Sequence, residues 1–214
     1  MARFLRSIAV LLLWLVAWPA QAAVVMTFWS HEFGNSFPHA FITLRGTPDA
    51  GGAAVDADYG FTAKTVSPAI LFGTVAGRVE PAPKAYIDKS DAQFAVTLTD
   101  AQYAEVLRLI AAWDEKTGDG HYNLNNRNCV HFVKEAARIA GLFDLDQPKL
   151  MKKPRSYLLA VEAANEGHVA KVNQDGKAYL ATLPPIDGIR PIEVGPARAP
   201  APAGTAAMPA TTPN

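Results

Sequence analysis

The chain has a single cysteine, Cys129, and its sequence context indicates nucleophilic chemistry. Asn128 is a typical N-cap residue, and an apolar periodicity begins after it, so the pattern predicts a helix whose first turn holds Cys129. The free N–H groups of a first turn favour an anion and lower the pKa of a thiol, and the thiolate is the nucleophilic form. We therefore expect Cys129 to be a catalytic nucleophile. The alternative is a buried cysteine that behaves as a small apolar residue.

A thiol nucleophile needs a base, and histidine is the usual one. Of the five histidines, His39 opens an apolar strand pattern, which would hold its imidazole at a sheet end, although a lone strand histidine is often structural. His131 lies two residues after the cysteine, on another side of the predicted helix, so we expect a structural role for it. His121 in the preceding loop is an alternative base, whereas His31 and His168 have no distinguishing context.

Both ends of the chain are predicted to lie outside the folded domain. Residues 1–22 combine two arginines, a ten-residue apolar run and a small-x-small site, which predicts a secretory signal peptide. The run is too short to span a bilayer, and an uncleaved N-terminal anchor is the alternative. Residues 190–214 are rich in Pro and Ala and predict a disordered tail. We expect a protein that is periplasmic or extracellular after cleavage.

The residues between, 23–189, predict one α+β domain. We expect strands at 24–29, 39–44, 55–62 and 94–98, and a long loop over 63–92 with a short strand near 77–80. A Thr99-x-x-Gln102 capping box opens a helix that extends to Trp113. Further helices are predicted over 129–140 and 156–165, and a hairpin joins 169–172 to 177–181.

Composition excludes several classes of function. Twenty basic residues balance twenty acidic ones, which argues against a nucleic-acid partner. The chain has no spaced set of metal ligands, no phosphate-binding glycine-lysine loop and no Gly-x-Ser-x-Gly motif, so we expect no metal and no cofactor.

The segment from Asn128 to Val133 (NCVHFV) resembles the Asn-Cys-x-His-Phe-Val signature of the circularly permuted papain-like superfamily. This superfamily includes NlpC-like permuted amidases and the lecithin retinol acyltransferase group. The His strand precedes the Cys helix in these proteins, and His39 and Cys129 have that order. A second similarity, in segments 34–41 and 58–61, is to exported bacterial proteins of which some transfer acyl chains onto lipoproteins. The resemblance implies an antiparallel sheet with the Cys-bearing helix packed against it.

The resemblance also implies a Cys nucleophile, a His base and a third polar group that orients the imidazole. That group is another histidine in the acyltransferases, whereas the following strand here offers Asp58, which is our expected orienting residue; an exposed strand acid is the alternative. The oxyanion would bind the backbone N–H of Cys129, with the side chain of Asn126 or Asn128 as a further donor. The N-cap role of Asn128 competes with that assignment.

These observations predict an exported cysteine-dependent acyl-transfer enzyme, with an amidase or peptidase acting on a cell-envelope amide as the first expectation. A lipid or lipoprotein acyltransferase or thioesterase is one alternative, and a non-catalytic envelope-binding module is another. The expected partner is a peptide, peptidoglycan or lipid-type substrate. The basic run Lys149–Arg155 leaves a peripheral membrane contact open, although such a run is usually only a solvated turn.

Overall fold

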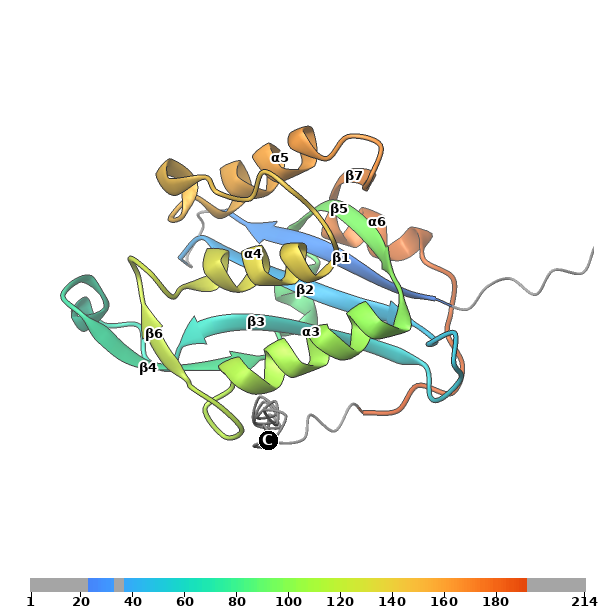
Figure 1. The fold of residues 1–214 in the computed structure, drawn as a ribbon, viewed down its shortest axis with the longest axis horizontal. Helices are drawn as coiled ribbons and strands as arrows, with labels where there is room; N and C mark the ends of the chain where they lie inside the picture. The colour runs from blue at the N-terminus through green and yellow to red at the C-terminus, as the bar shows by residue number, and fades with distance from the viewer. Residues whose placement is uncertain (1–22, 33–36, 192–214) are drawn as a thin grey trace, which may run out of the picture.

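A computed structural model of the protein describes residues 23–32 and 37–191 (Figure 1). The predicted signal peptide, 1–22, lies outside the described residues, and so does the predicted tail from residue 192 onward. The described residues form an α+β fold, as the sequence predicts.

The sheet contains seven strands in the order β6-β4-β3-β2-β1-β5-β7, and every pair of neighbours is antiparallel. The strands are β1 (Val24–His31), β2 (His39–Gly46), β3 (Val55–Ala63), β4 (Thr74–Glu80), β5 (Asp91–Leu98), β6 (His121–Asn123) and β7 (Ala170–Asp175). The four strands predicted in the first half of the chain are confirmed, and each is longer than its apolar core suggested.

The helices lie on both faces of this sheet. They are α2 (Lys84–Ile87), α3 (Asp100–Trp113), α4 (Cys129–Ile139), α5 (Pro154–Ala164) and α6 (Gly176–Thr182), with short 3-10 turns η1 (Pro68–Leu71) and η2 (Pro148–Leu150). The three long helices α3, α4 and α5 cover one face, while α6 lies behind the sheet (Figure 1).

Alternation along the strands divides the core into two parts, because successive side chains of a strand point to opposite faces. Met26 and Phe28 of β1 pack with the long helices in the larger cluster. Trp29 of β1 and Phe41 of β2 form a smaller cluster on the other face, where their rings stack 5.7 Å apart under α2 and α6.

The predicted hairpin over 169–181 is wrong. Its first strand exists as β7, but β7 pairs with β5, and the residues after Asp175 form helix α6. The side chain of Asp175 accepts hydrogen bonds from the backbone N–H groups of Lys177 and Ala178, which starts a helix where a turn was expected. The segment 63–92 is also more ordered than predicted, because the short strand expected near 77–80 extends back to Thr74 as β4, and helix α2 was not predicted.

One end of the sheet holds the residues that the sequence predicts to be the nucleophile and its base. His31 ends β1, His39 begins β2, Ala63 ends β3 and Thr74 begins β4, so the antiparallel order brings these four residues to the same end. Helix α4 also begins there, because β6 pairs with β4 at Thr74 and leads directly into it. We call this the thiol end.

Candidate functional site

Cys129 is the first residue of α4, as predicted. The side-chain oxygen of Asn128 accepts hydrogen bonds from the backbone N–H groups of Val130 and His131. The ring of His131 in turn accepts the Asn128 N–H at 3.3 Å, which completes a capping box. His131 therefore has the structural role expected of it.

The thiol of Cys129 is buried, with 6% of the residue exposed. Burial raises its pKa to about 11, because the thiolate would lose its hydration. The backbone N–H groups of Ala40, Val130 and Cys129 itself oppose this rise and do not cancel it. The expectation of a lowered thiol pKa is therefore wrong for this structure, since desolvation outweighs the helix N-terminus.

His39 lies next to Ala40 at the start of β2, so the thiol contacts the residue that directly follows it. The imidazole packs 6.1 Å from the ring of Phe41 and 6.5 Å from the ring of Tyr86. Burial, with a smaller contribution from His31, lowers the pKa of His39 to about 4. The imidazole is therefore neutral at pH 7 and can accept a proton.

The imidazole and the thiol approach β2 from different sides. His39 shares the side of Phe41, whereas Ala40 packs in the cluster that contains Cys129. No hydrogen bond joins the two groups, both of which are within the described residues. The ladder between β2 and β3 ends at the Ile42–Tyr59 pair, and β2 and β3 are unpaired from there to His39. The His39 ring thus lies beside a stretch in which β2 and β3 form no ladder pairs, although a Cβ on Gly60 would still be 3.2 Å from Cβ of Phe41.

Tyr86 of α2 packs against His39 and lies close enough to Cys129 for a thiolate there to affect the pKa of its hydroxyl. Its ring stacks on His31 at 4.1 Å and meets His39 edge-on. Burial raises the pKa of its hydroxyl, and the nearby charge of a Cys129 thiolate raises it further. The same two causes raise the pKa of Tyr122 in β6. Neither tyrosine is among the residues predicted from the sequence. Tyr122 is close to Cys129 along the chain, but nothing in the segment around Tyr86 indicates that Tyr86 lies near the thiol.

Asp58 does not orient the imidazole in this structure. It pairs across the ladder with Thr43, four residues along β2 from His39, and the residue beside the ring is Gly60. The Asp58 carboxylate accepts the backbone N–H of Ala82. Burial raises its pKa, and that hydrogen bond partly opposes the rise. The strand register, which the sequence does not show, separates the acid from the base.

The side chain of Asn128 is not available as an oxyanion donor, whereas the role of Asn126 stays a prediction. Asn128 is buried, and its side-chain N–H groups donate to the carbonyls of Leu124 and Met151, each at 2.8 Å. Asn126 is exposed in the turn before α4. The remaining donor of the predicted set is the backbone N–H of Cys129, which faces its own sulfur.

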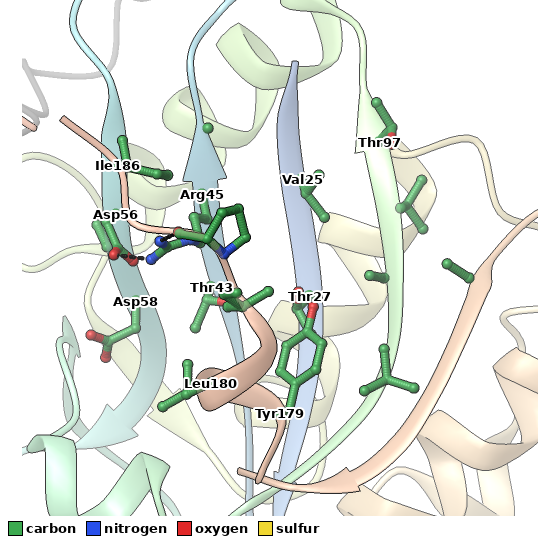
Figure 2. A pocket seen from close by; sticks show the side chains of 18 of the residues that line it. Val25, Thr27, Thr43, Arg45, Asp56, Asp58, Thr97, Tyr179, Leu180 and Ile186 are labelled. Carbon is green, nitrogen blue, oxygen red and sulfur yellow. Dashed lines mark hydrogen bonds and ion pairs between the residues drawn. The ribbon is translucent and has the colours of Figure 1, made fainter. Parts of the chain in front are cut away.

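A cavity of about 970 Å³ lies on the side of the sheet that α6 partly covers. Figure 2 shows Thr43 and Thr27 on its floor, with Tyr179 and Leu180 of α6 above them. Asp58 lines this cavity, whereas Cys129 and His39 do not. The Arg45–Asp56 ion pair closes part of its rim, and Arg45 also donates to the Pro184 carbonyl. The cavity is thus separate from the thiol.

Among the described residues, no group of three or more His, Cys, Asp or Glu side chains is arranged to hold a metal ion. No helix in those segments has the length and apolar character needed to cross a bilayer.

Comparison with known proteins gives no match: no family model, no curated protein and no solved structure is significantly similar to this chain.

Proposed function

We propose that the protein is an exported cysteine-dependent acyl-transfer enzyme with a permuted papain-like fold, and that it hydrolyses an amide of the cell envelope. The observation that carries this proposal is the position of Cys129, at the N-terminus of α4 and against the residue that follows His39. The order of the His strand and the Cys helix along the chain agrees with the permuted arrangement.

The protonation states favour a base-assisted attack over a preformed ion pair. With the pKa of the thiol at about 11 and that of the imidazole at about 4, both groups are neutral at pH 7. His39 takes the thiol proton as Sγ bonds to the carbonyl carbon of the substrate. The backbone N–H of Cys129 donates to the developing oxyanion.

In the remaining steps the proton passes to the leaving amine, and water then releases the acyl group. The amide C–N bond breaks, the leaving amine takes the proton from the imidazolium, and a thioester is left on Cys129. Water then attacks the thioester with His39 as base, which releases the acid and restores the thiol. An amine in place of water would give acyl transfer. Attack requires the His39 ring and the thiol to move within hydrogen-bond distance of each other from their different sides of β2.

Acyl-enzyme trapping tests this proposal. The chain lacking residues 1–22 is mixed with p-nitrophenyl butyrate, and intact-mass spectrometry follows the butyryl adduct. We expect an adduct on Cys129 that is absent from Cys129→Ala and forms at least about tenfold more slowly in His39→Ala. His121→Ala is the matched control, because the His121 ring, the alternative base in the sequence, is exposed at the start of β6 and pairs with Asp119. Equal adduct formation in His39→Ala and the unchanged chain would contradict the Cys–His pair.

A non-catalytic binding module is the second candidate, and one observation favours it: the thiol is buried and is not hydrogen-bonded to the imidazole. A chain that forms no adduct, with a thiol that reacts only on unfolding, would support this reading over the enzyme.

A further inference from the structure

An apolar tip projects from the thiol end. It comprises residues 65–73, between β3 and β4, and it protrudes from the body of the protein (Figure 1). Val66, Leu71 and Phe72 are 59%, 67% and 86% exposed there. No charged residue occurs between Lys64 and Arg78, so the tip presents only apolar and neutral polar groups. Exposed large apolar side chains that gather on one segment usually mark a contact surface.

The tip is connected directly to the start of α4. Thr74, which follows it, pairs with Asn123 of β6, and the Asn123 amide donates to the Thr74 hydroxyl at 3.1 Å. Asn123 also pairs with Arg127, the residue before the N-cap of α4. The apolar tip and Cys129 therefore share the thiol end.

A basic cluster flanks the same helix start on its other side. Lys149, Lys152 and Lys153 are exposed, and no ion pair involves them within the described residues. The side chain of Asn128 donates to the carbonyl of Met151, which fixes this segment beside the N-terminus of α4. The basic charge is local, because the chain as a whole carries equal numbers of basic and acidic residues.

We propose that the thiol end binds the surface of an anionic lipid bilayer, with the apolar tip in the interfacial region and the basic cluster on the lipid headgroups. Apolar side chains beside cationic ones are the combination that binds a charged bilayer surface. A membrane suits the tip better than a protein partner, because a stable protein interface needs about 800 Å² from each side and the tip is a single narrow loop.

This inference goes beyond the proposed function and does not depend on turnover. It places the start of α4 toward the lipid surface, which would present Cys129 to lipid-linked or membrane-proximal substrates.

Vesicle flotation tests the inference on the chain lacking residues 1–22, so that the apolar run near the N-terminus cannot anchor it. Vesicles of phosphatidylcholine with and without phosphatidylglycerol are compared. We expect binding to the anionic vesicles only, weakened about tenfold or more by Lys149→Gln with Lys152→Gln, and by raised salt. Arg108→Glu makes an equal charge change on α3 and should leave binding unchanged.

The contribution of the apolar tip is tested with a tip variant and a control variant at another exposed phenylalanine. Leu71→Ser with Phe72→Ser should abolish most of the binding, while Phe143→Ser, at a residue 46% exposed after the far end of α4, should not. Cys129→Ala should bind as the unchanged chain does, which separates this surface from catalysis. Absence of binding to anionic vesicles, or equal binding by the tip variant, would overturn the inference. Equal binding would mean that another surface of the protein binds the vesicles.

Discussion

The imidazole of His39 lies directly over Gly60 of β3. A Cβ placed on Gly60 would be 2.5 Å from Nε2 of His39 and 3.2 Å from Cβ of Phe41. Any side chain at position 60 therefore has to displace the proposed base or the strand that carries it.

Gly60→Ala should move the His39 ring. We expect a loss of about 1–3 kcal/mol in the free energy of unfolding, since the added methyl overpacks a buried site, and a changed rate of acylation at Cys129. Urea denaturation and the histidine ring resonances in NMR measure the two effects. Gly73→Ala is the control, because nothing lies within 4 Å of a Cβ there. Unchanged His39 resonances in Gly60→Ala would contradict the close contact.

Stability should fall in mild acid through His39. Its pKa is about 4 in the folded chain against 6.5 for an ordinary histidine, so the unfolded chain binds the proton more readily. The stabilising contribution is present above pH 6.5 and is lost as the pH falls from there toward 4, by about 3 kcal/mol.

Denaturation midpoints measured between pH 7 and pH 4 test this pH dependence, because this range covers the His39 pKa of the unfolded chain, 6.5, and that of the folded chain, about 4. His39→Gln should flatten the dependence, whereas His121→Gln, at an exposed histidine, should preserve it. His31 and His131 also have lowered pKa values from burial, so a smaller slope of the same sign should persist in His39→Gln. An identical slope in His39→Gln and the unchanged chain would contradict a lowered pKa at His39.

Alkylation of Cys129 should be slow at neutral pH. The thiol is buried and its pKa is raised from 9.0 to about 11, so iodoacetamide should react more slowly than with free cysteine at pH 7. The rate should rise with pH beyond the range in which an ordinary thiol has fully ionised. The unfolded chain in denaturant supplies the reference rate. Rapid alkylation near pH 6 would instead indicate a preformed thiolate–imidazole pair.

Asn128→Ala should destabilise the fold more than loss of a surface cap does. Asn128 accepts two backbone N–H groups of α4 and donates to two carbonyls, all in a buried position. We expect a loss of about 2–4 kcal/mol, because the deletion removes the cap and leaves the half-buried carbonyls of Leu124 and Met151 without this donor. Thr99→Ala removes the exposed cap of α3 and should cost about 1 kcal/mol. Equal losses in the two variants would contradict the structural role given to Asn128.

Local interactions made much of this protein predictable from its sequence. Thr99 and Asn128 form capping boxes with residues three positions along, and the helices begin where those spacings place them. The apolar run from His39 to Leu44 likewise predicted a strand that starts at His39. Each of these features depends on neighbours within a few residues, so the sequence alone determines them.

The environment of the proposed site was decided by tertiary structure. Strand register places Asp58 opposite Thr43 and puts Gly60 beside His39. Packing of α4 on the sheet buries Cys129 and raises its pKa against the effect of the helix N-terminus. Register and burial depend on segments distant in sequence, and desolvation is set by everything that surrounds a group. For this reason the positions of Cys129 at the start of α4 and of His39 at the start of β2 could be predicted from the sequence, while the protonation states and mutual geometry of the two side chains could not.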